Sequence, residues 1–366
     1  MKVPLAKPYI TDAEFSSVKS VLESGQLYHG PIGEQFEKRF ARYIGTEHAV
    51  CLNSGTSALF LAIKSLRKKG DIIVPSFTYV ATINAIITSS CRPVFCDIGP
   101  CTFNLDPALI EEKITRQTIA ILPVHFAGLS CDMKPIAEIC ERHGLNLIED
   151  SAHAIGAQFQ GKKTGSFGTG CFSFDPLKNM TTGEGGMLTT DDASIATYAR
   201  LLRSQGINRT VGTFPWHRES VVAGYSLGMP EASAALGLVQ LSRLDEMNAL
   251  RRRNAEYYAK RLEHEELELP LRSDSHTYQM FNIKVGRAID RNKFVMHLRN
   301  HGVEASVHFD PPVHMMKIIK QKATLPVTED VAGRIVTLPM YPQLATEEMD
   351  FVTEKVKEGL RLCRLP

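Results

Sequence analysis

The sequence predicts an α/β fold, with a mainly parallel seven-stranded sheet in a large domain and a smaller C-terminal α+β domain. Its 366 residues correspond to about two domains at ~150 residues each. Over the first two thirds, short β-rich apolar runs alternate with helical stretches, and this pattern changes after Pro230. We therefore expect the large domain to cover residues 1–240 and the small one residues 241–366.

The large domain is predicted from seven apolar runs, most of them bounded by Gly, Pro, Asn or Asp. Short runs rich in β-branched or aromatic residues suit strands that are buried on both faces of a parallel sheet. The runs are His48–Leu52, Ile72–Val74, Val94–Asp97, Ile119–Val124, Leu145–Glu149, Cys171–Phe174 and Met187–Thr190. Helical stretches lie at Ser57–Lys69, Ala81–Ser89, Pro107–Ile114, Lys134–His143 and Ser194–Ser204. This alternation favours an open sheet with helices on both faces.

The last third of the chain has a different pattern. One long helix is predicted from Glu231 to His264, because Leu238, Leu241 and Leu244 recur at helical spacing. Two strand-like runs and two further helices follow and make up the small domain. The strand-like runs are Gln279–Val285 and Val303–His308, and the helices are Arg291–Asn300 and Thr346–Leu362.

Composition excludes several classes of protein. The formal net charge is +2, too near zero to hold a nucleic acid or an anionic membrane surface, so we expect neither partner. No uncharged apolar run approaches the ~20 residues of a membrane helix, and the N-terminus lacks the apolar region of a signal peptide. The 8 cysteines are scattered, which indicates reduced thiols in a cytoplasmic protein. The histidines show no zinc spacing, so no metal is expected.

Lys178 is the first candidate catalytic residue. It follows the predicted strand Cys171–Phe174 and precedes the Gly-rich run Gly183-Glu-Gly-Gly186, where the backbone can approach a ligand closely. A lysine in a closed site can lose its proton and attack a carbonyl, forming a Schiff base. The alternative is a surface lysine near a hairpin.

Asp150 is the second candidate, at the end of the apolar run before Ser151-Ala-His153. Open α/β sheets place ligand groups at the carboxyl ends of their strands. A buried carboxylate there needs a cationic or hydrogen-bonding partner, and the protonated ring nitrogen of pyridoxal phosphate is one. The alternative is an Asp that caps the following turn. His153 alone suits a core histidine bonded to a backbone carbonyl.

Two strand-to-helix junctions offer further contacts. In Asn53-Ser-Gly-Thr-Ser57, Gly55 and Thr56 lie at a predicted helix N-terminus, which suits a phosphate, although an ordinary N-cap explains the same residues. In Pro75-Ser-Phe-Thr-Tyr-Val80, Tyr79 can cover a flat ring. A third segment, Gly156–Lys163, resembles a phosphate-binding P-loop but ends in Lys rather than Ser or Thr, so we reject nucleotide hydrolysis.

Taken together and in this order, the motifs resemble the DegT/DnrJ/EryC1/StrS family of pyridoxal-phosphate-dependent sugar aminotransferases, which has the aspartate aminotransferase-like fold. The similarity extends from Pro4-Leu-Ala-Lys-Pro8 to Leu338-Pro-Met-Tyr341. The resemblance implies that the large domain binds pyridoxal 5'-phosphate. Its implied contacts are Lys178 as the Schiff-base lysine, Asp150 at the ring nitrogen, His153 beside the phenolic oxygen, Gly55, Thr56 and Ser173 at the phosphate, and Tyr79 stacked on the ring.

The substrate side matches the family less closely. Segments Val307-His308-Phe309 and Pro311-Pro-Val-His314 resemble the family's C-terminal residues near the substrate, which implies roles for His308 and His314. Family members usually have Gly-x-Asn-x-Arg-Met in the segment that a neighbouring subunit contributes to the site. Here Gly224–Met229 has Ser226 and Gly228 in place of the amide and the base. We expect Ser226 at the substrate, and Arg203–Ser220, with Trp216 and His217, in the pocket wall.

The activity that the resemblance implies is transfer of an amino group from glutamate or glutamine to a keto sugar, which we expect to be nucleotide-linked. It also implies a homodimer with the active site at the interface. Two alternatives stay open: an aminotransferase that acts on a cyclitol or another keto substrate, and a non-catalytic regulator that binds pyridoxal phosphate. Lys178 argues against the branch of the family in which His replaces this lysine and the enzyme is a sugar dehydratase.

Overall fold

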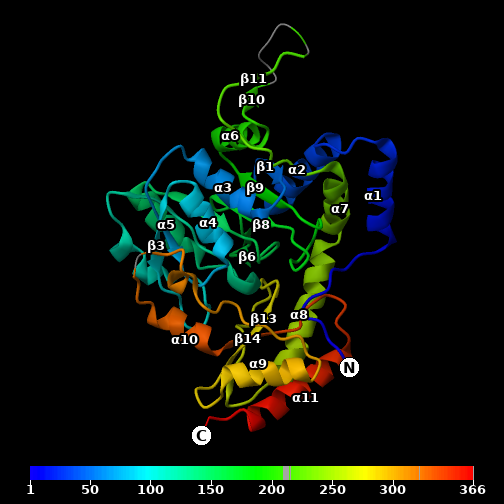
Figure 1. Cartoon of the computed structure of the whole chain (residues 1–366), viewed down its shortest axis with the longest axis vertical. Helices are drawn as coiled ribbons and strands as arrows, with labels where there is room; N and C mark the ends of the chain where they lie inside the picture. The colour runs from blue at the N-terminus through cyan, green and yellow to red at the C-terminus, as the bar shows by residue number, and fades with distance from the viewer. Residues whose placement is uncertain (209–213, 215, 321, 366) are drawn as a thin grey trace.

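The computed structural model describes residues 1–208, 214, 216–320 and 322–365. Its centre is the predicted seven-stranded sheet, in the order β1-β9-β8-β5-β4-β2-β3 (Figure 1). Only β9 runs opposite to its two neighbours among the paired strands of this described sheet. The strands are β1 (His48–Leu52), β2 (Asp71–Pro75), β3 (Arg92–Cys96), β4 (Thr118–Ile121), β5 (Asn146–Asp150), β8 (Thr169–Ser173) and β9 (Gly186–Thr190). The predicted fold class is confirmed.

Helices bury both faces of this sheet, which is why its strands are apolar throughout. Successive residues of a strand point to opposite faces. Ile72 and Val74 pack with α3 and α4, whereas Ile73 lies between them in sequence and packs with α5 on the other face. The helices of this part are α2 (Pro31–Ile44), α3 (Gly55–Ser65), α4 (Val80–Thr88), α5 (Met133–His143) and α6 (Ala193–Arg203).

Two predicted helices need correction. The stretch Glu231–His264 is not one helix but two, α7 (Glu231–Ser242) and α8 (Leu244–Arg261). The chain leaves helical geometry at Arg243, with φ −111° and ψ 2°, and the Arg243 guanidinium pairs with Glu14 of α1 (Asp12–Ser24) at 2.9 Å. The predicted helix Pro107–Ile114 is two short 3₁₀ turns, η1 (Pro107–Leu109) and η2 (Glu111–Lys113), and the backbone is already extended at Ile114.

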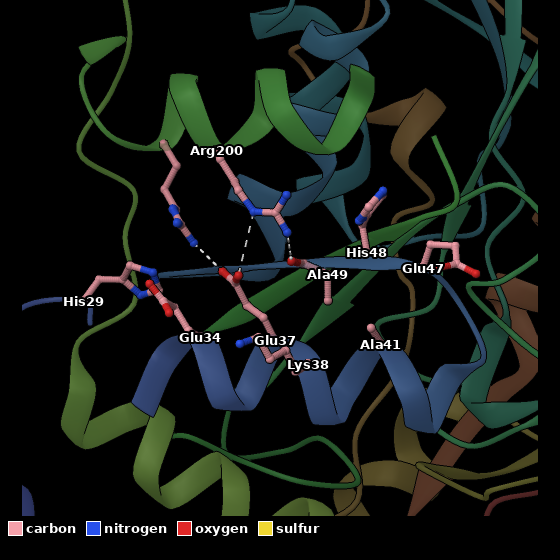
Figure 2. A pocket seen from close by; sticks show the side chains of 10 residues that line it. His29, Glu34, Glu37, Lys38, Ala41, Glu47, His48, Ala49 and Arg200 are labelled. Carbon is pink, nitrogen blue, oxygen red and sulfur yellow. Dashed lines mark hydrogen bonds and ion pairs between the residues drawn. The ribbon is translucent and has the colours of Figure 1, made fainter. Parts of the chain in front are cut away.

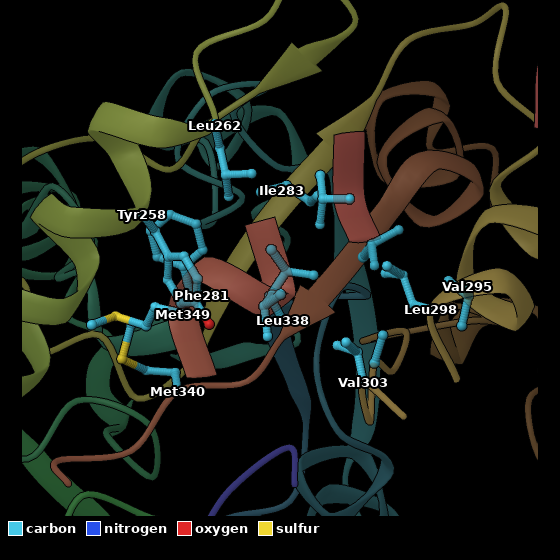
Figure 3. Packing of buried hydrophobic residues seen from close by; sticks show 14 of the residues in the cluster. Tyr258, Leu262, Phe281, Ile283, Val295, Leu298, Val303, Leu338, Met340 and Met349 are labelled. Atoms are coloured by element: carbon cyan, nitrogen blue, oxygen red, sulfur yellow. The ribbon is translucent and has the colours of Figure 1, made fainter. Parts of the chain in front are cut away.

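The C-terminal part packs three strands and two helices against the end of α8 (Figure 1). Figure 3 shows apolar side chains of α8, β13, β14 and α9 pointing toward one another. The elements are β12 (Leu267–Glu268), β13 (Phe281–Val285), α9 (Arg291–Asn300), β14 (Ile335–Leu338) and α11 (Thr346–Leu362). The run Val303–His308 is not a strand: it makes single bridges at Val303 and Ser306, so its prediction is wrong.

Shorter elements complete the described chain. The hairpin β6 (Gln158–Phe159) and β7 (Lys162–Lys163) occupies the segment rejected as a P-loop. The others are β10 (Ile207–Asn208), β11 (Glu219–Ser220), α10 (Pro326–Arg334), η3 (Phe126–Gly128) and η4 (Val313–Met315). No helix within the described residues is both long and apolar enough to cross a membrane. The domain boundary at residue 240 stays a prediction, and Val3 packs in the C-terminal core rather than with the sheet.

Candidate active site

The carboxyl ends of several parallel strands meet at one edge of the sheet, and the candidate residues lie there. Asp150 is the last residue of β5 and Ser173 the last of β8, while α3 begins at Gly55 just after β1. A Cβ atom on Gly55 would lie 2.6 Å from Cβ of Ser173, and one on Gly186 would lie 2.2 Å from the carbonyl oxygen of Ser54. Both positions therefore require glycine, and the start of α3 lies directly against the ends of β8 and β9.

Asp150 is a buried carboxylate with spare capacity to accept hydrogen bonds. It is 5% exposed. The Thr82 hydroxyl donates to its Oδ2 at 2.7 Å, and the Ala152 backbone N–H donates to its Oδ1 at 3.2 Å. A carboxylate offers about four acceptor sites. Burial raises the pKa of Asp150, while the hydrogen bond from Thr82, the one from Ala152 and the charge of Lys178 act in the opposite direction.

Lys178 lies in the turn after β8, partly buried and close enough to Asp150 for their charges to interact. Burial lowers the pKa of Lys178, and the negative charges of Asp150 and Asp175 oppose that shift. Its neighbours in the chain are fixed on both sides, since the Gln279 side-chain amide donates to the Leu177 carbonyl at 2.9 Å. The side-chain amide of Asn179 donates to Asn248 at 2.8 Å. A held lysine with a lowered pKa suits both nucleophilic attack and proton transfer.

Two imidazoles, His153 and His308, lie near enough to Lys178 to feel its charge, and aromatic rings pack beside them. His153 is buried, its Nδ1 has no hydrogen-bond partner among the residues that the structure describes, and its ring stacks on Phe309 at 6.3 Å between centroids. Tyr79 lies 6.3 Å from the same Phe309 ring and is 61% exposed, so its outer face is open. His308 bonds through Nδ1 to the Thr337 hydroxyl at 2.8 Å. Burial, aided by the charge of Lys178, lowers the pKa of His308 to about 4.

The remaining predicted residues have different surroundings. Thr56 is exposed in the first turn of α3, next to Gly55. His314 is buried and shares hydrogen bonds with Ser76 at 2.6 Å and with Glu329 at 3.3 Å, so both of its ring nitrogens are engaged within the protein. Ser226 is exposed, and its backbone forms a bridge with Ser204. The substrate roles of His308, His314 and Ser226 stay predictions.

A profile of the DegT/DnrJ/EryC1/StrS aminotransferase family matches residues 8–357. The chain belongs to this family. Its members use pyridoxal phosphate, so the protein is a pyridoxal-phosphate-dependent aminotransferase. The family predicted from the motifs is confirmed.

Relatives match this aminotransferase over almost its whole length. The spore coat polysaccharide biosynthesis protein SpsC of Bacillus subtilis (strain 168) is 36% identical, with 97% of this chain and 96% of the relative covered. Helicobacter pylori PseC, an aminotransferase involved in the biosynthesis of pseudoaminic acid, superposes with a TM-score of 0.95 at 27% identity, covering 99% of this chain and 100% of that one. The PLP-form of the Streptococcus pneumoniae protein Spr1654, described as a putative sugar aminotransferase, gives 0.93 at 28% identity, covering 99% of each chain.

The residues of this aminotransferase fit the cofactor chemically. The N-terminus of α3 presents backbone N–H groups that have no carbonyl partner within the helix, which suits a phosphate. The spare acceptor capacity of Asp150 suits a protonated ring nitrogen, and the unpartnered Nδ1 of His153 suits a polar ring substituent. Together with the lowered pKa of Lys178, these groups form a consistent set.

The departure from the family pattern at Gly228 leaves open space. A Cβ atom there would meet nothing nearer than Cβ of His29 at 3.8 Å, so nothing in the described structure requires glycine at this position. The predicted pocket-wall segment Arg203–Ser220 is described only in part, because residues 209–213 and 215 lie outside the described residues. Its Trp216 is 73% exposed and stacks on Phe214.

A separate cavity of about 270 Å³ lies between α2, β1 and α6 (Figure 2). In its wall Glu37 accepts a hydrogen bond from Arg203 at 2.6 Å, and the His29 of the wall has its Nδ1 3.5 Å from the thiol of the fully buried Cys51. His29, Glu37 and Cys51 are of the types that ligate metals. However, the Arg203 guanidinium, 3.7 Å from the Cys51 sulfur, already supplies the positive charge there and would repel a metal ion.

Thr78, Thr82 and Gln279 are contact residues that no sequence prediction named. Thr82 lies in the first turn of α4, whereas Thr78 precedes the helix and its N-cap Tyr79, so helical spacing does not pair them. No local sequence signal marks the bond from Thr82 to Asp150. Gln279 reaches the turn of Lys178 across about a hundred residues of chain, and no local signal marks it.

Proposed function

We propose that the enzyme transfers the amino group of glutamate or glutamine to a keto sugar, and that the sugar is nucleotide-linked. The observation that carries the proposal is that two unusual groups lie near each other. Burial lowers the pKa of Lys178, and the nearby buried carboxylate of Asp150 has spare capacity to accept hydrogen bonds. The sugar is supported by relatives that are described as an aminotransferase of pseudoaminic acid biosynthesis and as a protein of spore coat polysaccharide biosynthesis.

The roles of the residues follow from their chemistry. When bound, pyridoxal phosphate supplies an electron sink for the carbon from which a proton is removed. Lys178 in its neutral form would act as the general base that takes the proton from the α-carbon of the amino donor, and in its protonated form as the acid that gives it back. Asp150 would hold the ring nitrogen of the bound cofactor in its protonated form. The proposed phosphate contacts are Gly55, Thr56 and Ser173.

Two further residues orient the ring. His153, whose Nδ1 is unpartnered within the described residues, would meet the phenolic oxygen of the bound ring, and the exposed Tyr79 would cover one face of that ring. Tyr79 excludes water from that side once the site is filled. We propose that a second copy of the chain completes the site, as in the homodimer that the family pattern implies, and that the enzyme works in the cytoplasm, where its eight free cysteines stay reduced.

A cyclitol or another keto substrate is the second candidate, and the open space at Gly228 favours it. A larger or less charged acceptor could occupy the volume in which the family usually has a base. Membership of an aminotransferase family argues against the remaining alternative, a non-catalytic regulator that binds pyridoxal phosphate.

The test is an acceptor panel. The holoenzyme is supplied with glutamate and, in separate reactions, with nucleotide-linked keto sugars, a keto-cyclitol and simple keto acids, and the aminated product is identified by mass spectrometry. We expect a product with at least one nucleotide-linked keto sugar. Product with the keto-cyclitol or a keto acid alone would support the second candidate. Sedimentation that shows a fully active monomer would contradict the dimer.

A further inference from the structure

We propose that Thr78 and Thr82 form a directed pair of hydroxyl groups that orients Asp150 and keeps it ionised, and that both are positioning residues of the active site. The inference rests on the proposed role of Asp150 as the partner of the cofactor's ring nitrogen. It assigns a function to two side chains that come from another strand-to-helix junction, about 70 residues away in sequence.

The direction of the two hydrogen bonds follows from counting protons. The Thr82 hydroxyl lies 2.7 Å from Oδ2 of Asp150 and 2.8 Å from the Thr78 hydroxyl. An ionised carboxylate only accepts, so the single proton of Thr82 points to Asp150. The Thr78 hydroxyl must then donate to the Thr82 oxygen. Both O–H dipoles therefore point toward the carboxylate, and each hydrogen bond strengthens the other.

Burial makes this arrangement matter. Thr78 and Thr82 are each 1% exposed, so no bulk water replaces a lost donor. Loss of hydration favours the neutral acid form of Asp150, and a neutral acid cannot stabilise a protonated ring nitrogen. The hydrogen bond from the hydroxyl pair favours the ionised form of Asp150 and so opposes the effect of lost hydration. The Ala152 N–H donates to the other oxygen, so a hydrogen bond holds each end of the carboxylate. The remaining lone pairs of Asp150 stay available to accept from the ring nitrogen of the cofactor.

The junction that carries the pair has two functional sides. Tyr79, the N-cap of α4, is 61% exposed and faces outward, whereas Thr78 and Thr82 on either side of it in sequence are buried. The Thr82 N–H bonds to the Tyr79 carbonyl at 3.1 Å, which ties the two sides together. One short segment would thus cover the ring through Tyr79 and tune the group behind it through the threonines.

The test compares four variants after reconstitution with nitrogen-15-labelled pyridoxal phosphate. Thr82→Val removes the donor at nearly constant volume, Thr82→Ser keeps it, and Thr78→Val removes only the outer hydroxyl. The matched control is Thr353→Val, a buried threonine of α11 that bonds to the Met349 carbonyl. The readouts are the nitrogen-15 chemical shift of the cofactor ring, which distinguishes a protonated from a neutral nitrogen, and the dissociation constant of the cofactor.

We expect the ring nitrogen of Thr82→Val to shift toward the neutral value and its cofactor to bind about ten- to a hundredfold more weakly, the range for losing a hydrogen bond to a charged group. Thr82→Ser should match the wild type, and Thr78→Val should bind about fivefold more weakly, as for a lost neutral hydrogen bond. The control should leave both readouts unchanged. Thermal unfolding of every variant verifies folding, and Thr78→Val carries the test if Thr82→Val does not fold.

Wild-type shifts and affinities in Thr82→Val and Thr78→Val would overturn the inference. Asp150→Asn separates this failure from that of the proposed function. If Asp150→Asn neutralises the ring nitrogen and Thr82→Val does not, only the hydroxyl pair is refuted. If Asp150→Asn leaves the nitrogen protonated, the proposed role of Asp150 fails, and the inference that rests on it fails as well.

Discussion

Two consecutive carboxylates at the end of β5, Glu149 and Asp150, have opposite surroundings. Glu149 is 0% exposed and accepts backbone N–H groups from Phe167 at 2.7 Å, Gly168 at 3.0 Å and Gly165 at 2.8 Å. Its Oε2 also lies 3.1 Å from Nε2 of His125. Within the described part of the chain Asp150 has two donors to its side chain, the Thr82 hydroxyl and the Ala152 N–H.

The difference separates a carboxylate that the fold uses for its own hydrogen bonds from the one that we propose to be functional. All the hydrogen bonds that Glu149 accepts come from the protein. The Cys131 N–H donates to Nδ1 of His125, so the proton of the His125 ring is on Nε2 and is donated to Glu149. Asp150 keeps lone pairs for a group that the chain does not supply. Adjacent strand residues point to opposite faces, so one strand end can hold the fold together on one side and a ligand on the other.

The largest effect should come from Lys178→Ala, which removes the proposed base on the functional side. We expect multiple-turnover transamination to fall by roughly 10⁴-fold, the upper range for losing a general base. Cofactor binding should stay measurable, because the phosphate and ring contacts remain. The measurement is steady-state turnover beside equilibrium dialysis with the cofactor, with the exposed Lys19→Ala as control. Normal turnover by Lys178→Ala would refute the assignment.

Asp150→Asn should separate activity from stability. The neutral amide cannot stabilise the protonated ring, so we expect turnover to drop by about 10²–10³-fold, the range for losing one preorganised electrostatic contact. The melting temperature of the cofactor-free protein should change little, because the Asn oxygen can accept from the Ala152 N–H while its NH₂ group donates to the Thr82 hydroxyl, which can turn its own proton to Thr78. Activity close to the wild type would mean that Asp150 is structural, like its neighbour.

Glu149→Gln should give the reverse pattern. The amide group of Gln cannot accept the backbone N–H groups that both carboxylate oxygens now bind, so a buried donor loses its partner. We expect the free energy of unfolding to fall by about 3 kcal/mol, as measured by urea denaturation of the cofactor-free protein. The folded fraction should retain catalytic turnover within a fewfold. A stable but inactive Glu149→Gln would break the contrast between the two carboxylates.

The smallest effect concerns the pH dependence of stability that two largely buried, neutral histidines of the C-terminal part should cause. Burial lowers the pKa of His276 to about 3, and burial and Lys178 lower that of His308 to about 4. Both bind protons near pH 6.5 once unfolded. Their contribution to stability is therefore complete above pH 6.5 and is lost as pH falls from there toward their folded pKa values.

Each such histidine should cost up to about 1.4 kcal/mol per pH unit below pH 6.5. Urea midpoints of the cofactor-free protein at pH 7 and pH 5 measure the slope. His276→Gln should make the slope shallower by one proton, while the exposed His217→Gln should not. An unchanged slope in His276→Gln would contradict the assignment of His276 as a neutral buried group.

The sheet could be predicted because its signals are local. Each of the seven strands is a short apolar run, most of them bounded by Gly, Pro, Asn or Asp, and the structure contains all seven. The break at Arg243 was not visible, since the apolar face of the helix continues on both sides and the contact that uses Arg243 comes from Glu14, more than 200 residues away. β14 was missed because its pairing with β13 defines it. No prediction covered α2, although Pro31 and Gly45 mark its ends.

The site was predictable by residue type and family pattern, but not by its supporting contacts. Lys178, Asp150 and His153 stand out in sequence and lie close together in the structure. The bonds from Thr82 to Asp150 and from Gln279 to the turn of Lys178 join segments far apart in the chain. Sequence spacing carries no information about such bonds, which depend on how the strand ends converge.

The most direct test of the central claim is to locate the cofactor's covalent attachment. The holoenzyme is reduced with borohydride and digested, and the labelled peptide is sequenced by mass spectrometry. We predict one label, on Lys178, which is lost when the amino donor is added before reduction. A label on another lysine, or no label on a protein that transaminates normally, would contradict the account.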